Sequence, residues 1–93
     1  MSADCLFCKI LAGDVPADRV YEDDHCLAFR DINPQAPHHV LIIPRKHIAS
    51  LNEMGEADEK IVGHLYRAAA KIADQLGIAR PGYRCVVNTN EGA

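Results

Sequence analysis

The 93-residue sequence predicts a single α+β domain, 1–93, in which an antiparallel meander sheet is combined with one long and one short helix. Three observations predict this class. Residues 19–32 alternate between apolar and polar side chains, as strands do, and residues 38–43 form a short apolar run. Between residues 56 and 76 the apolar residues recur at helical spacing. With 48% apolar residues, the chain can build one small core.

The short helix is expected first, from Asp4 to about Ala12. Asp4 can cap its start, and Gly13 can end it in the left-handed conformation. An apolar stripe is expected to bury one face of this helix. It consists of Leu6, Phe7 and Ile10.

Three strands are expected next. Residues 19–23 and 25–32 read as a hairpin whose turn contains Asp23 and Asp24. Pro34 and Pro37 then force a loop, because each removes a backbone donor and favours an extended predecessor. The third strand is predicted over 38–43, and its continuous apolar character suits burial on both faces.

The long helix is predicted from about Glu56 to Leu76, ending at Gly77. Ser50 and Glu53 can form a capping box for one turn before it. His64 falls at the edge of the apolar stripe. The stripe consists of Ile61, Val62, Leu65, Ala69, Ile72, Ala73 and Leu76. The segment 82–87 is expected to be a further strand, followed by a polar tail.

Charge and hydropathy exclude two classes of partner. The net charge is −3, with acids and bases interleaved, so no basic stripe is available to a nucleic acid polymer. No apolar run reaches the length of a membrane span, and the first residues carry acids where a signal peptide would carry bases. We therefore expect a cytoplasmic protein without a membrane partner. A domain this small is also expected to gain stability from a partner subunit.

The four cysteines are not expected to form two disulfides in a reducing compartment. Cys26 and Cys85 lie among apolar residues and are expected to be small core side chains. Cys5-x-x-Cys8 leaves metal binding, redox chemistry and packing open. If it binds zinc, His47 is the best candidate for a third ligand, and spacing does not identify the fourth.

No residue pattern points to a nucleophile or a phosphate loop. Ser2 and Ser50 are explained as tail and cap residues, and no glycine cluster precedes the long helix. Asp31, His39 and Asn88 lie instead at predicted strand ends, where small-ligand sites form. Asp31 could accept from a sugar hydroxyl, while His39 and Asn88 could donate to a phosphate.

The stretch AFRDINPQAPHHVLIIPRKHI, with DCLFCKI before it and GYRCVVNTNEGA after it, resembles the histidine triad superfamily, specifically its Hint branch of nucleoside phosphoramidases. The resemblance runs from about Asp4 to the end of the chain. It implies a homodimer with a continuous antiparallel sheet that binds a purine nucleotide resembling AMP. It also implies hydrolysis of the bond between the α-phosphate and an amine, through a nucleotidyl-histidine intermediate and without an organic cofactor.

The resemblance also implies roles for individual residues. Asp31 matches the carboxylate that accepts from the ribose, Asn88 a polar residue near the phosphate, and His39 a supporting histidine bordering the active site. Leu6, Phe7, Ile10, Phe29 and Ile32 match the pocket for base and ribose. Cys5, Cys8 and His47 match three of the four ligands of a structural zinc found in some bacterial members.

The chain departs from the family at one feature. In the family, a His-x-His-x-His motif follows the segment that matches VVNTNEGA. This motif supplies the nucleophile and also the fourth zinc ligand. Residues 1–93 contain no such motif. We therefore expect these residues to be the N-terminal part of a longer protein, without the last sheet strand and the catalytic histidine. The alternative is a non-catalytic nucleotide-binding module or a dimeric interaction module.

Overall fold

The structure is a computed structural model that describes residues 5–93. It divides into two compact units, residues 1–47 and 48–93, which are described separately. Whether they form the single domain expected from the sequence stays a prediction. The expected cap at Asp4 lies outside the described residues.

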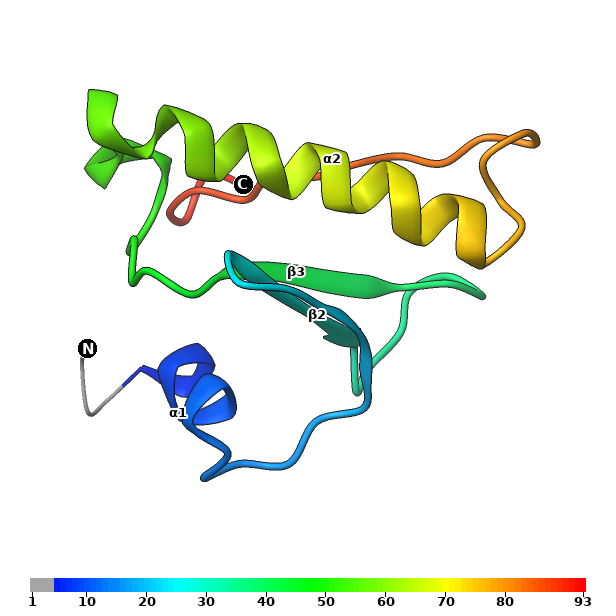
Figure 1. Cartoon of the computed structure of the whole chain (residues 1–93), viewed down its shortest axis with the longest axis horizontal. Helices are drawn as coiled ribbons and strands as arrows, with labels where there is room; N and C mark the ends of the chain where they lie inside the picture. Colours follow the sequence, from blue (N-terminus) through cyan, green and yellow to red (C-terminus); the bar gives the residue numbers. More distant parts are fainter. Residues whose placement is uncertain (1–4) are drawn as a thin grey trace. The chain divides into compact units, whose positions relative to one another are not determined.

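The first unit opens with the short helix α1, Leu6–Ala12 (Figure 1). Cys5 occupies the N-cap position, and its Sγ accepts a hydrogen bond from the Cys8 backbone N–H. Gly13 ends the helix with a φ of 84°, as predicted, and its N–H donates to the Ile10 carbonyl at 3.1 Å. The start and end of this helix are therefore encoded by residues at its two termini.

The expected burial of α1 is only partly correct. Ile10 is buried, but Leu6 and Phe7 are 57% and 42% exposed. Ile10 and Leu11 of the second turn pack in the core, whereas Phe7 only meets the edge of the core, through the Phe29 ring. The predicted stripe was wrong for these two residues, which leaves them available to a ligand or partner.

Three antiparallel strands form the sheet in the order β1-β2-β3, which confirms the predicted meander. They are β1 (Arg19–Glu22), β2 (Cys26–Arg30) and β3 (Val40–Pro44). The third strand begins later than predicted, because His38 and His39 belong to the loop that enters it. The loop is still joined to the sheet, since the Asp31 N–H donates to the His39 carbonyl at 2.9 Å.

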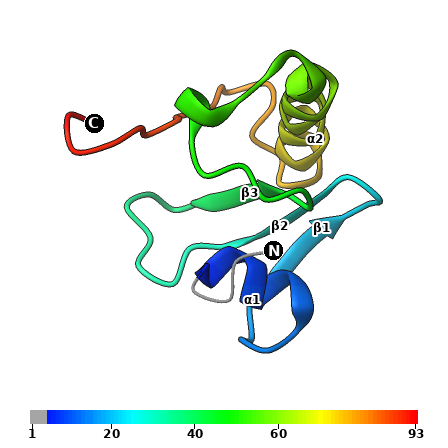
Figure 2. The same ribbon diagram turned by 90° about the vertical axis from the view of Figure 1, so that its left-hand side faces the viewer.

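The core of this unit lies between α1 and one face of the sheet (Figure 2). It consists of Ile10, Leu27, Phe29 and Ile43. Leu27 pairs with Ile43 and Phe29 with Leu41, so alternate residues of β2 and β3 project toward the helix. The intervening residues of β2, Cys26 and Ala28, are also fully buried. Both faces of the central strand are therefore covered.

The second unit is dominated by α2, Glu59–Gln75, preceded by the 3₁₀ turns Leu51–Glu53 and Glu56–Asp58. Ser50 caps the first turn, but its hydroxyl accepts from the Asn52 N–H at 3.2 Å instead of Glu53. Every residue of the predicted stripe is buried or half-buried, and Ala68 joins it. His64 is half-buried, as its position at the edge of the stripe predicts.

The predicted strand over 82–87 is not formed. Within residues 5–93 this segment makes no ladder with another strand, and Tyr83, Val86 and Val87 are about half exposed or more, at 47%, 62% and 52%. Cys85 is exposed as well, so its assignment to the core was wrong. A strand is defined by backbone pairing, and alternation of side chains does not provide a partner.

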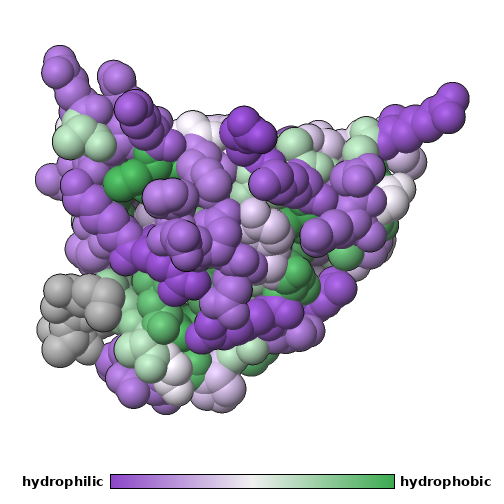
Figure 3. Space-filling view, in the orientation of Figure 1, coloured by the Kyte–Doolittle hydropathy of each residue, from purple (hydrophilic) through white to green (hydrophobic). Residues whose placement is uncertain are grey.

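The surface agrees with the interleaved charges of the sequence. In the space-filling view, hydrophilic side chains cover most of the visible face and hydrophobic ones show between them (Figure 3). None of the helices within residues 5–93 combines the length and apolar character needed to cross a bilayer.

Candidate functional site

Two thiols and an imidazole converge in the first unit, as the sequence predicts. Cys5 and Cys8 lie at the start of α1, and His47 lies three residues after β3. The Cys8 Sγ is 3.2 Å from the His47 Nδ1, and the three possible ligand atoms lie within 4.8 Å of one another. Cys8 is buried, Cys5 is half-buried and His47 is exposed. The fold thus joins residues separated by 39 positions.

This donor set suits zinc. Zinc bonds of about 2.3 Å to sulfur and about 2.0 Å to nitrogen keep tetrahedral ligand atoms roughly 3.5–3.8 Å apart. The Cys8 Sγ and the His47 Nδ1 are 3.2 Å apart, slightly closer than this, and all three ligand atoms lie within 4.8 Å of one another. Thiolate and imidazole are the ligands that structural zinc sites use most. The three residues can therefore supply three of the four ligands of a tetrahedral zinc site.

The hydrogen bonds at Cys5 favour the form of the thiol that binds a metal. The Cys8 backbone N–H, which donates to the Cys5 Sγ at 3.4 Å, is the largest cause that lowers the pKa of the Cys5 thiol. A further hydrogen bond with the Cys8 side chain acts in the same direction. Both stabilise the thiolate, which is the nucleophile and the metal ligand.

The lowered pKa gives a testable pH dependence. The Cys5 thiolate persists to lower pH than an ordinary thiolate. In metal-free protein we therefore expect iodoacetamide to keep alkylating Cys5 at pH values where its reaction with free cysteine has already declined. Peptide mass spectrometry after timed alkylation measures the profile. A profile that coincides with that of free cysteine would show that the hydrogen bonds do not act on the thiol.

The apolar residues expected around a base and ribose fall into two groups. Leu6, Phe7 and Ile32 are exposed, with Ile32 at 91%. Ile10 and Phe29 are buried in the core, so they can only support such a pocket from beneath. The Phe7 and Phe29 rings are in contact, with centroids 6.1 Å apart and a tilt of 58°. This contact links α1 to the strand that leads into Asp31.

Asp31 and His39 meet at the mouth of the loop between β2 and β3. The Asp31 Oδ2 lies 3.4 Å from the His39 Nε2. The Gln35 backbone N–H donates to the His39 Nδ1 at 3.0 Å, so the ring proton lies on Nε2 and faces the carboxylate. The Asp31 Oδ1 also accepts from the Asn33 N–H at 2.8 Å. The carboxylate is thereby oriented from two sides.

The sequence did not identify all of this arrangement. The bond from Asn33 to Asp31 is an Asx turn, which the Asp-x-Asn spacing could have indicated. The bond from Gln35 depends on how the loop folds back, and no residue pattern signals it. Asn88 lies in the other unit of the chain and is exposed.

The chain is similar in sequence to proteins of one superfamily. Residues 4–90 match the family described as "Scavenger mRNA decapping enzyme C-term binding". The purine nucleoside phosphoramidase of Escherichia coli is 48% identical over 90 residues, which cover 97% of this chain and 76% of that protein. A HIT-like protein of Synechococcus elongatus is 51% identical over 89 residues, covering 96% of this chain and 77% of that protein. The chain belongs to the histidine triad superfamily.

Solved structures of the histidine triad superfamily confirm the α+β fold. A HIT family hydrolase from Legionella pneumophila superposes with a TM-score of 0.93 at 49% identity, covering 96% of this chain and 80% of that chain. A histidine triad protein from Clostridium difficile superposes with a TM-score of 0.95 at 41% identity, covering 99% and 80%. The α+β fold of the chain is thus that of this superfamily.

Proposed function

We propose that this histidine triad protein binds a purine nucleotide resembling AMP and hydrolyses nucleoside phosphoramidates or adenylates. The observation that carries the proposal is the oriented Asp31 carboxylate, paired with His39 and followed directly by the exposed Ile32. The name of the Escherichia coli relative, a purine nucleoside phosphoramidase, supports the choice of substrate.

In this proposal, each residue acts through the chemistry of its side chain. Asp31 accepts from the ribose hydroxyls, and His39 borders the phosphate with its proton on Nε2. For Asn88, the resemblance to the family is the support for a donor role near the phosphate. The exposed apolar groups of Leu6, Phe7 and Ile32 cover the base and ribose, while Ile10 and Phe29 support them from the core.

The proposed reaction has two steps. A histidine nitrogen attacks the α-phosphorus, and the amine leaves with a proton, which yields a nucleotidyl-histidine. Water then attacks the phosphorus of the nucleotidyl-histidine, breaks its bond to the histidine nitrogen and releases the nucleotide. Residues 1–93 contain no His-x-His-x-His, so the proposal takes the nucleophile from outside them. His39 has a supporting role, because its Nδ1 is engaged by the Gln35 backbone.

Nucleotide binding tests the role of Asp31 directly. We expect Asp31→Asn to weaken AMP binding about tenfold, because a charged acceptor is replaced by a neutral one. The amide oxygen can still accept from the Asn33 N–H, so the turn is retained. Titration calorimetry measures the affinity, and Asp24→Asn, which removes a carboxylate from an exposed turn residue, is the control. Equal affinities for the two variants would refute the role of Asp31.

We also propose a structural zinc ion held by Cys5, Cys8 and His47. Their convergence and the lowered pKa of the Cys5 thiol support it. The ion would join the start of α1 to the end of β3 without touching the nucleotide. We also propose a cytoplasmic location, because thiols stay reduced in that compartment.

A homodimer is the third part of the proposal. Within the second unit, the exposed Tyr66, Tyr83, Val86 and Val87 offer apolar area. The segment from 82 to 87 pairs with no strand of residues 5–93, so strand pairing with a second copy is open to it. Sedimentation equilibrium tests this part, because a species of one chain at all concentrations would exclude the dimer.

A further inference from the structure

The two sides of the proposed zinc site come from distant parts of the chain. Cys5 caps α1 and Cys8 lies in its first turn, whereas His47 follows β3. The Sγ of Cys8 and the Nδ1 of His47 approach to 3.2 Å, yet nothing in their local sequence fixes this approach. The core cluster that contains Ile10 and Ile43 packs α1 against β3, and polar contacts can restrict the approach of the ligands further.

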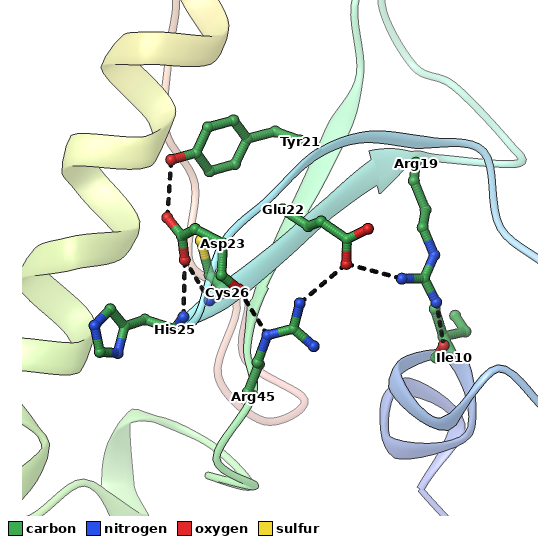
Figure 4. Close-up of polar contacts among 8 residues, drawn as sticks. All are labelled: Ile10, Arg19, Tyr21, Glu22, Asp23, His25, Cys26 and Arg45. Atoms are coloured by element: carbon green, nitrogen blue, oxygen red, sulfur yellow. Dashed lines mark hydrogen bonds and ion pairs between the residues drawn. The ribbon is translucent and has the colours of Figure 1, made fainter.

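A chain of hydrogen bonds on the same unit makes this connection (Figure 4). Arg19 donates from Nη2 to the Ile10 carbonyl of α1 at 3.1 Å, and from Nη1 to the Glu22 Oε2 at 3.0 Å. Arg45 donates from Nη2 to the same Glu22 oxygen at 3.0 Å, and from Nε to the Asp23 carbonyl at 2.7 Å. One carboxylate oxygen therefore joins both guanidinium groups.

We propose that Glu22, through Arg19 and Arg45, is a positioning residue for the zinc ligands; this inference rests on the proposed zinc site. Ile10 lies two residues after Cys8, and Arg45 lies two residues before His47. The contacts therefore act on the backbone close to the ligands at both ends. A zinc site tolerates deviations of only about 0.2 Å in its bond lengths, so small displacements reduce affinity.

The geometry distinguishes this series of hydrogen bonds from an ordinary surface ion pair. Isolated exposed pairs contribute little, because solvent screens them and ordering two side chains costs entropy. Here the side chains of Arg19, Glu22 and Arg45 are 36%, 48% and 37% exposed, and each guanidinium also donates to a backbone carbonyl. The backbone bonds restrict the side chains, so the carboxylate meets groups that are already oriented.

The same sheet offers a matched control. Asp18 pairs with the Arg30 Nε at 3.5 Å, next to β1 and at the end of β2. Asp18→Asn removes a carboxylate from an arginine pair, as Glu22→Gln does, but this pair involves neither α1 nor Arg45. Both variants change the net charge equally.

In the experiment, the purified, metal-free protein is titrated with Co²⁺, and binding is monitored by the thiolate charge-transfer absorption. Zn²⁺ is then added to compete with the bound Co²⁺. We expect Glu22→Gln to bind Co²⁺ about tenfold more weakly than the wild type, with altered absorption bands, as for other residues that orient metal ligands. Asp18→Asn is expected to match the wild type. If Glu22→Gln also matches it, the positioning role is refuted.

A second variant guards against misfolding of the first. Arg45→Lys keeps the charge but cannot contact Glu22 and the Asp23 carbonyl through two separate nitrogens. It should show the same loss, and wild-type affinity would overturn the inference. A wild-type protein that binds neither metal would overturn the zinc site itself, and the inference with it. If the wild type binds Co²⁺ and Zn²⁺ and the variants Glu22→Gln and Arg45→Lys bind them equally well, the positioning role is overturned and the zinc site stands.

Discussion

Replacing Cys8 by serine is expected to reduce the affinity of the protein for zinc by at least about 100-fold. The loss of a ligand should exceed the 10- to 100-fold cost of removing a residue that only orients one. Cys8 is 3% exposed, and its Sγ lies 3.2 Å from the His47 Nδ1, which makes it the most enclosed of the three ligands. Serine is nearly isosteric but does not provide a thiolate.

Competition with a chromophoric chelator measures this change. Cys85→Ser is the control, because Cys85 is exposed and lies outside the cluster. It should bind zinc as the wild type does. Retained affinity in Cys8→Ser, or an equal loss in Cys85→Ser, would contradict the assignment of the site.

The second large effect concerns the core. Leu27→Ala is expected to lower the free energy of unfolding by about 3 kcal/mol, within the usual range for a buried leucine. Leu27 is completely buried at the centre of β2 and packs with Ile10, Phe29 and Ile43. Removing its side chain leaves a cavity between the sheet and α1, which rigid strands fill only in part.

Urea denaturation followed by circular dichroism measures the change. Leu51→Ala removes the same atoms from a residue that is 48% exposed, and we expect a change of only about 0.5 kcal/mol or less. A loss below about 1 kcal/mol for Leu27→Ala would show that the core is not organised around this residue.

The sequence predicts most of the secondary structure because local rules determine it here. Gly13 ends α1 through its positive φ, and the apolar spacing of α2 matches its buried side. The segment 82–87 shows the limit of such rules. Its side chains are typical of a strand, but pairing depends on a partner that residue patterns do not reveal. The exposure of Cys85 follows from the same cause.

The candidate site likewise contains contacts that the sequence predicts and contacts that it does not. Cys5 and Cys8 are brought together by one helical turn, and Asp31 meets His39 because neighbouring antiparallel strands end there. These contacts follow from topology and could be predicted. The link from Arg19 to Arg45 through Glu22 could not, because it depends on side-chain rotamers and on the bulge between Arg19 and Tyr21.

We propose that this histidine triad protein cleaves a nucleotide bond through a covalent histidine. The most direct measurement is a rapid acid quench of the intact cellular protein with adenosine phosphoramidate, followed by intact-mass and peptide mass spectrometry. We predict release of AMP and one nucleotidyl group attached to a histidine at early times. Saturable AMP binding without release or adduct would contradict the claim and indicate a nucleotide-binding module without turnover.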